Sequence, residues 1–205
     1  MRILAILGVV LLASTTAYAD NHEAGGSSKI SFGLEAGYAS AKTGSANSAL
    51  AQSLADSTGR TVTVTYKQTT YAGRLFGLYE LNEKLDVEVG YMNTGSLDSD
   101  FSFSGTTTTM AIGLKANGFD AGVRFKPNSD VFLKLGVHNY DLDAKGTVTI
   151  SGTSYSATST DNETKPYYGV GYNLNETTSI GVTIYTKVGG SDGGDVSFVY
   201  AGYKF

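Results

Sequence analysis

Few residues in this sequence could perform chemistry. The chain has no cysteine and only two histidines, which excludes disulfides, thiol nucleophiles and the usual zinc-binding sets. A lipid-modifying active site would need a serine, a histidine and a carboxylate close together. The candidates are His138, its neighbours Tyr140, Asp141 and Asp143, and the serines Ser96, Ser99 and Ser102. Because polar segments commonly contain serines, we expect no enzyme, no metal and no cofactor.

A second set of candidates consists of isolated charged residues in segments that alternate between apolar and polar positions. They are Glu35, Arg74, Asp86, Glu88, Asp120, Arg124, Lys134, Lys187 and Lys204. The polar faces mix glycines with these charges, which suits the crowded interior of a narrow barrel. A buried charge costs several kcal/mol unless it is paired. We therefore predict a plug of salt bridges in the lumen. A gate, in which exchange of partners opens a narrow ion path, is the alternative.

The alternation itself defines the elements that must carry these charges. Around Val182, for example, Ile180 and Ile184 share the apolar face, whereas Gly181 and Thr183 lie on the other. A period of two predicts β-strands. A soluble sandwich would show the same period, but a face of glycines and single charges fits a lumen, and continuous apolar faces edged by tyrosines fit lipid. The sequence predicts an all-β fold, an eight-stranded antiparallel transmembrane up-and-down β-barrel.

The chain divides into three segments. Residues 1–19 combine Arg2, an apolar run too short for a membrane-spanning helix and a small-residue end, which is typical of a cleaved signal peptide. Residues 20–28 form a short periplasmic leader, and residues 29–205 form the barrel domain. Loss of Arg2 lowers the formal net charge from −4 to −5. Without a basic stripe, nucleic acid is not an expected partner.

The connections alternate between short and long. Residues 81–84, 127–130 and 175–177 read as tight turns, and long polar links cover 41–68, 96–107 and 142–163, with a shorter one at 189–194. This predicts periplasmic turns and four extracellular loops on a monomer. Within residues 45–59 the spacing of apolar residues permits a short amphipathic helix, although we favour a solvated loop. An extracellular ligand at the loops is an open alternative.

Residues 110–125 contain a change of phase. The apolar positions are even-numbered up to Ala116 and odd-numbered from Phe119, and Asn117-Gly118 lies between them. Asn-Gly is a strong hairpin signal and would create a ninth strand. Because bacterial single-chain barrels have even strand numbers, we predict one long strand with a β-bulge at this point.

Several stretches resemble the OmpA-like transmembrane domain, the small outer-membrane β-barrel family. They are residues 74–82, 87–91, 133–137, 168–172 and 201–205. The resemblance implies a bacterial outer-membrane protein whose role lies in envelope integrity and surface interaction, with outer-membrane lipid and lipopolysaccharide as neighbours. It also implies that the closing Tyr203 and Phe205 are an assembly signal for the outer-membrane assembly machinery. Longer members carry a peptidoglycan-binding domain. Since this sequence stops at Phe205, we expect no tethering to the cell wall.

Overall fold

The computed structural model describes residues 29–188 and 194–205, so the predicted signal peptide and leader lie outside the described residues. These described residues form one helix and ten strands, in the order β1 (Ile30–Ala41), α2 (Gly44–Thr58), β2 (Val62–Tyr66), β3 (Thr69–Asn82), β4 (Leu85–Thr94), β5 (Leu97–Phe103), β6 (Thr109–Phe125), β7 (Val131–Ile150), β8 (Thr153–Asn173), β9 (Thr178–Val188) and β10 (Gly194–Lys204).

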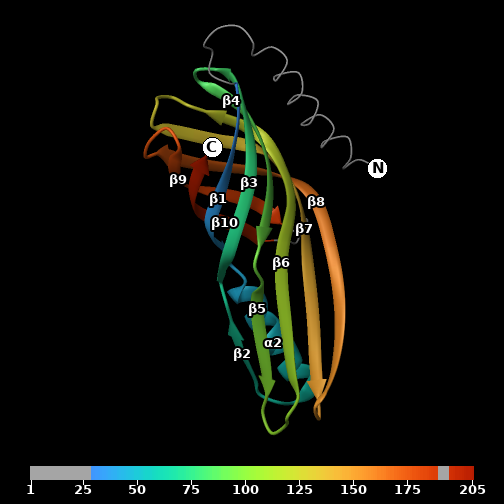
Figure 1. The fold of residues 1–205 in the computed structure, drawn as a ribbon. Helices are drawn as coiled ribbons and strands as arrows, with labels where there is room; N and C mark the ends of the chain where they lie inside the picture. Colours follow the sequence, from blue (N-terminus) through green and yellow to red (C-terminus); the bar gives the residue numbers. More distant parts are fainter. Residues whose placement is uncertain (1–28, 189–193) are drawn as a thin grey trace, which may run out of the picture.

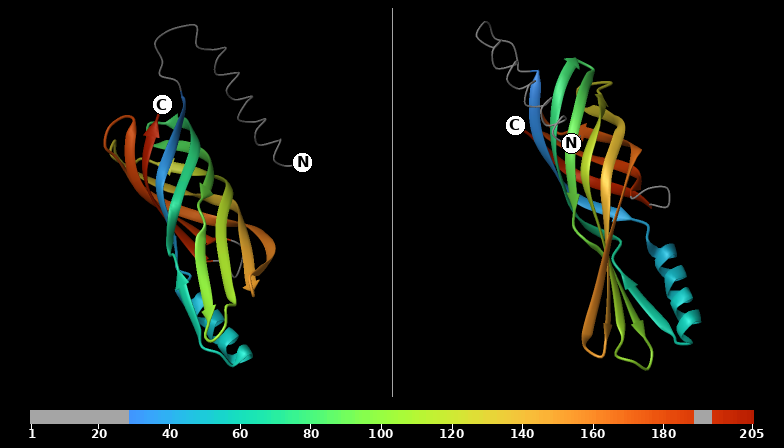
Figure 2. Two further views of the ribbon diagram at one scale, coloured as in Figure 1. Left: turned by 60° about the horizontal axis from the view of Figure 1, so that its bottom comes forward. Right: turned by 90° about the vertical axis from the view of Figure 1, so that its right-hand side faces the viewer.

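Eight of these strands close into an antiparallel barrel, as the sequence predicts (Figures 1 and 2). Around the wall the order is β1, β10, β9, β8, β7, β6, β4 and β3, and β3 returns to β1. The first and last strands pair along Leu34↔Tyr203 and Ala36↔Ala201, which closes the wall. A closed wall leaves no unpaired strand edge in lipid.

The two ends of the barrel differ. The turns β3–β4, β6–β7 and β8–β9 are short and share one end with the start of β1 and the end of β10, so the predicted turns are confirmed. At the other end β6, β7 and β8 continue beyond the barrel. Together with β2, β5 and α2 they form an extension (Figure 2). The sequence analysis predicts that the short turns are periplasmic and that the long connections are extracellular, and we name the two ends of the barrel accordingly.

Two predicted loops are strands, which corrects the sequence interpretation. Residues 96–107 contain β5, which pairs with β6 and β2. Residues 142–163 continue β7 and β8, which pair without interruption up to Ile150↔Thr153. The connecting Ser151 and Gly152 both have positive φ, 49° and 86°, as a two-residue hairpin turn of type I′ requires. A polar segment rich in serine and threonine is typical of a loop, but it is equally typical of a strand that is exposed to water.

The first long connection contains a helix, so our preference for a solvated loop was wrong. Asn47 and Ala51 of α2 are buried against the extension, and Asn47 Nδ2 donates a hydrogen bond of 2.9 Å to Ser99 Oγ of β5. The left-handed Gly59 ends the helix at φ 65°. Among the residues that the structure describes, no helix is both long and apolar enough to cross a membrane.

β6 is one long strand, as predicted, but the bulge is not at Asn117-Gly118. Pairing with β7 runs through this point without a shift. The extra residue lies instead in the neighbouring strand, where Asn93 pairs with Asn117 but Leu97 pairs with Leu114. Even-numbered residues face inward along the whole of β6. The apolar set changes phase because the outer face passes from lipid to water, so apolar residues move to the interior.

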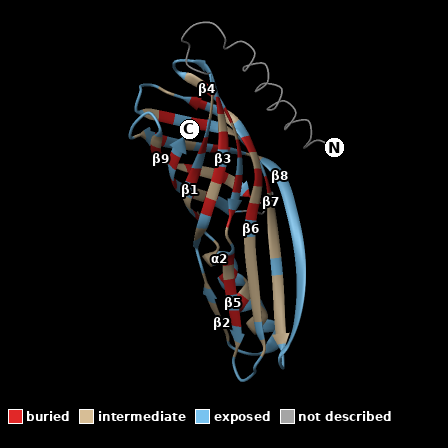
Figure 3. Cartoon of the chain, viewed as in Figure 1, coloured by how far each residue is buried: buried red, intermediate tan, exposed pale blue. Residues whose placement is uncertain are grey.

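The barrel wall outside the extension has the inverse distribution, with large apolar side chains exposed on its outer face and charged residues buried inside. Figure 3 shows buried and exposed positions next to each other along these strands. The exposed set includes Phe32, Leu34, Leu75, Val87, Val123, Leu133, Leu135, Val170, Ile180 and Val199. Tyrosines such as Tyr38, Tyr71, Tyr172 and Tyr203 are also exposed. An apolar outer face with aromatic residues is the surface that a barrel presents to a bilayer.

Candidate functional site

Six charged residues meet inside the barrel, three acidic and three basic. They are Glu35 of β1, Arg74 of β3, Glu88 of β4, Asp120 and Arg124 of β6 and Lys134 of β7. All six belong to the predicted set. Each is buried, and Glu35 and Glu88 are fully so. We call these residues the lumen cluster.

Arg74 lies at the centre of the lumen cluster and contacts all three carboxylates. Its Nη1 donates to Glu35 Oε2 at 3.0 Å and its Nη2 to Glu88 Oε1 at 2.7 Å. Nε and Nη2 also bind Asp120 as a fork, at 2.9 Å to Oδ2 and 2.5 Å to Oδ1. A planar guanidinium suits such multidentate pairing, because it offers several donors in fixed directions. Removal of Arg74 would leave three buried carboxylates with two cations.

The other two cations complete the network. Arg124 donates to Glu88 Oε2 from Nε and Nη2, at 3.0 and 2.6 Å. Lys134 forms ion pairs with Glu35 and, at 3.3 Å, with Glu88. The strands that carry Glu35 and Lys134, β1 and β7, stand opposite each other in the ring of eight. The Glu35–Lys134 pair therefore reaches from one side of the lumen to the other.

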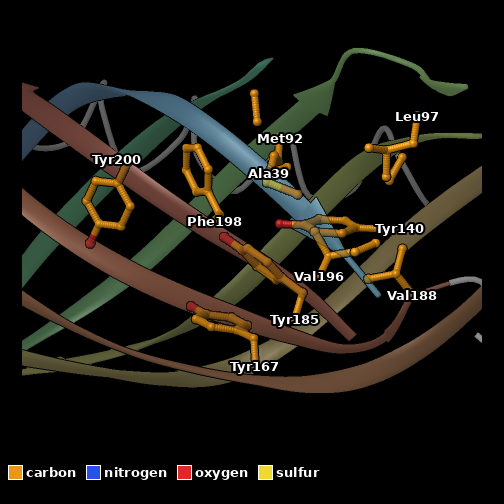
Figure 4. Packing of buried hydrophobic residues seen from close by; sticks show 13 residues of the cluster. Ala39, Met92, Leu97, Tyr140, Tyr167, Tyr185, Val188, Val196, Phe198 and Tyr200 are labelled. Carbon is orange, nitrogen blue, oxygen red and sulfur yellow. The ribbon is translucent and has the colours of Figure 1, made fainter. Parts of the chain in front are cut away.

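Aromatic side chains occupy the interior beside the lumen cluster. The rings of Tyr140, Tyr167 and Tyr185 gather inside the barrel (Figure 4), and those of Tyr167 and Tyr185 are 5.4 Å apart. Tyr140 donates a 2.6 Å hydrogen bond to Asp120 Oδ2, and Arg124 lies 4.2 Å from the ring centre of Phe132. The sequence analysis named Tyr140 only as a neighbour of His138 and gave the other three aromatic residues no role. A signal was present for Phe132 and Tyr140, which share the strand phase of Lys134 in β7.

Three predicted charges lie outside the lumen cluster. Asp86 pairs with Lys126 at 2.8 Å near the periplasmic end. Lys204 is exposed and lines an open cavity of about 740 Å³ at the same end. Lys187 is exposed because the pairing of β9 with β10 shifts beside it and its φ is +46°, so the side chain turns away from the lumen. The placement of Lys187 in the lumen was therefore wrong.

An apolar layer lies in the lumen on the extracellular side of the cluster. It is formed by Ala39, Leu97, Leu114, Ala116, Leu142, Val188 and Val196. The cavity among these residues is small, about 70 Å³. This layer contains Leu114 and Ala116, two of the even-numbered apolar residues of β6 that the sequence analysis had assigned to the lipid side.

His138 has no serine among its hydrogen-bond partners in the described part of the chain. Its Nε2 lies 2.8 Å from the carbonyl oxygen of Thr186, and its ring packs 4.7 Å from that of Tyr140. Ser96 and Ser99 bond to Asp98 and Asn47 instead. The histidine is therefore placed as a packed interior side chain.

The two residues of the predicted assembly signal lie on the outside of the barrel. Tyr203 and Phe205 are both exposed, and their ring centres lie 6.5 Å apart. The backbone N–H of Phe205 donates to the carbonyl oxygen of Phe32, which ties the end of the chain to β1.

A closed barrel with an apolar outer wall and a charged interior defines a class, the bacterial outer-membrane β-barrel proteins. The family model described as OmpA-like transmembrane domain matches residues 27–190, and the chain belongs to this family. It is a protein of the bacterial outer membrane. A search of curated protein sequences found no match.

Solved structures show the same fold. Ail, the attachment invasion locus protein of Yersinia pestis, crystallised with the heparin analogue sucrose octasulfate, is 18% identical with a TM-score of 0.52. The match covers 86% of this chain and 99% of that one. The outer membrane protein OprG from Pseudomonas aeruginosa is 14% identical with a TM-score of 0.48, over 85% of this chain and 95% of that one.

Proposed function

We propose that this protein is a barrel with a plugged lumen that serves envelope integrity and presents its extracellular extension as an adhesive surface. Under this proposal the protein is not an enzyme. The observation that most directly supports a plugged lumen is the lumen cluster, whose Glu35–Lys134 ion pair links opposite strands of the ring.

Two features favour a closed lumen rather than a gated pore. The lumen cluster is balanced in charge, so an opening that separates its members would leave buried ions unpaired, at roughly 3–5 kcal/mol for each broken partner. The apolar layer of Leu97, Leu114 and Leu142 then lies in series with it. An ion that crosses the lumen would have to pass both barriers.

Solute uptake by proteoliposomes tests the plug. Vesicles with the wild-type protein should swell no faster in a small neutral sugar than protein-free vesicles. A variant with Lys134→Ala and Leu114→Ala together opens space in both layers and is the comparison. Swelling of wild-type vesicles as fast as those of this variant would refute a plug and favour the pore.

The adhesive role is supported by one edge of β8, over residues 153–164, that pairs with no other strand of the described residues, which we call the free edge. Residues 153–164 pair with β7 on one side, whereas β9 reaches only residues 167–173 on the other. These residues are exposed on both faces, as Figure 3 shows for the projecting part of β8. An exposed strand edge offers unpaired N–H and C=O groups, to which an extended partner segment can add as a further strand.

The charge of the extension argues against a polyanionic ligand of the kind seen with Ail. In the projecting β7–β8 hairpin, Asp141, Asp143, Asp161 and Glu163 outnumber the lysines. A sulfated polysaccharide would be repelled by this excess. A protein segment bound through its backbone fits the edge better.

Two neighbouring proline substitutions test the edge. In a strand, the N–H groups of consecutive residues point to opposite sides, and proline has no N–H. One of the variants Thr158→Pro and Ser159→Pro therefore loses an N–H that pairs with β7. The other loses an N–H of the free edge. Thermal unfolding identifies the variant that leaves the hairpin intact. That variant should lose adhesion of expressing bacteria to cultured epithelial cells, with alanine at the same position as the control. Full adhesion by that variant would refute a role of the free edge in adhesion.

We also propose that Tyr203 and Phe205 are recognised by the outer-membrane assembly machinery, and that the protein is a monomer in contact with lipid and lipopolysaccharide. The outward placement of both rings at the end of β10 supports recognition during insertion. Lys204 faces the periplasmic mouth and Lys187 faces outward, so neither is included in the plug.

A further inference from the structure

The lipid-facing wall contains a hollow of about 370 Å³, which lies in the size range of small-ligand pockets. Its floor follows one row of paired residues across the wall, Phe32↔Gly77, Gly77↔Val89, Val89↔Ala121 and Ala121↔Val137. Gly77 and Ala121 leave the depression, because their neighbours in the row carry larger side chains. Tyr91 and Phe119 of the next row flank it with a ring pair 4.9 Å apart.

The hollow crosses the membrane obliquely. Phe32 lies near the periplasmic start of β1, whereas Val137 lies well along β7 toward the extension. Since both belong to one paired row, the hollow runs from the extracellular side of the membrane at β7 to the periplasmic side at β1. Such a slanted apolar channel, open to lipid, matches the path of a single acyl chain.

Polar side chains form a rim at the extracellular end of the hollow, where Asn139 and Thr164 are part of the lining. Asn139 Nδ2 donates to Thr164 Oγ1 at 3.0 Å and to Asn162 Oδ1 at 2.8 Å. Asn162 Nδ2 donates to Asp141 Oδ1. Asn139, Asn162 and Thr164 are exposed on the outer face of the wall, at the level where the headgroups of the outer leaflet begin.

The rim has the chemistry that recognises sugar hydroxyls. The amides of Asn139 and Asn162 can donate to and accept from neighbouring hydroxyl groups, and the carboxylate of Asp141 accepts from them but repels a phosphate at the same place. A headgroup that satisfies the rim must therefore carry several hydroxyls, and it must be attached to an acyl chain.

We propose that the hollow and its rim bind a glycolipid of the outer leaflet, with one acyl chain along the Gly77–Ala121 floor and the sugar on Asn139, Asp141 and Asn162. The site deepens the proposed contact with lipopolysaccharide and rests on that part of the proposed function. It does not depend on the plug, since a conducting barrel would carry the same outer wall.

The wall offers an internal control. A second lipid-facing hollow, of about 780 Å³, lies over β8, β9, β10 and β1 and includes Ala201, Gly37 and Gly181. Its lining consists of glycine, alanine, aliphatic and tyrosine residues, without an amide or a carboxylate. Acyl chains can enter both hollows, but only the first combines a hollow with a sugar-binding rim.

Native mass spectrometry of the full-length protein, released from nanodiscs that contain lipid A and phosphatidylethanolamine, tests the site. The wild type should retain lipid A in preference to the phospholipid. Ala121→Leu, which fills the hollow, and the pair Asn139→Ala with Asn162→Ala, which removes the rim, should each lower the retained fraction about tenfold. Ala201→Leu, in the second hollow, should change nothing.

Three results would overturn the proposal. One is equal retention of lipid A by the wild type and both site variants. Another is an equal loss in Ala201→Leu, which would mean unspecific lipid contact. The third is wild-type retention of phosphatidylethanolamine as strong as that of lipid A, which would assign the hollow to phospholipid. The rim variant changes only exposed side chains and carries the test if Ala121→Leu fails to refold.

Discussion

Replacement of Arg74 by methionine gives the sharpest prediction for the stability of the barrel. Methionine keeps the length of the apolar stem but removes the charge that contacts Glu35, Glu88 and Asp120. Three buried carboxylates would then share Arg124 and Lys134. Breaking a buried ion pair from one side costs about 3–5 kcal/mol. The free energy of unfolding, measured with a denaturant in lipid vesicles, should fall by that amount.

A charge-balanced double variant separates the electrostatic loss from a packing loss. Within the described part of the chain, Arg74 is the one cation of the lumen cluster that forms an ion pair with Asp120. Arg74→Met with Asp120→Asn therefore leaves two acidic and two basic partners. This variant should recover about 2 kcal/mol of the loss. Lys67→Met, in the exposed ion pair with Asp98, should cost about 1 kcal/mol or less. Equal losses for Arg74→Met and Lys67→Met, or no recovery, would refute the reasoning.

Three further predictions concern facing, assembly and topology. Val182→Arg places a charge on the lipid side and should cost about 2–4 kcal/mol in the same unfolding assay, whereas the interior change Thr183→Val should cost less; equal costs would refute the facing. Phe205→Ala should lower the amount of folded barrel in outer-membrane fractions while refolding from urea in vitro is retained, and normal amounts in cells would argue against an assembly signal. A cysteine at Ser156 should react with an impermeant maleimide on intact cells and one at Asn128 should not; the reverse pattern would invert the topology.

The sequence predicted the barrel because a period of two is a property of each strand alone. Residues such as Ile180 and Val182 on one face, and Glu35 or Arg74 on the other, are assigned correctly from local alternation. Which charges contact one another depends on the register between strands, and this could not be read from the sequence. The same limit hid the role of Tyr140, which reaches Asp120 from the neighbouring strand.

The errors arise where the surroundings of the wall change. Alternation shows which residues share a face, but it does not show whether that face meets lipid, water or the lumen. Leu114 and Ala116 are therefore interior residues of a segment whose outer face meets water, although their pattern resembles a lipid-facing one. Lys187 was misplaced because a local shift in register leaves it exposed and makes the next residue, Val188, a buried one.

The central claim is that the lumen cluster and the apolar layer close the barrel. Single-channel recording of the refolded protein in a planar bilayer tests it most directly, with Arg74→Ala and Arg124→Ala recorded beside the wild type. The account predicts a silent wild-type protein, and any openings should be confined to the variants. Steady openings of the wild type, enlarged in the arginine variants, would contradict the plug and show that the cluster acts as a gate.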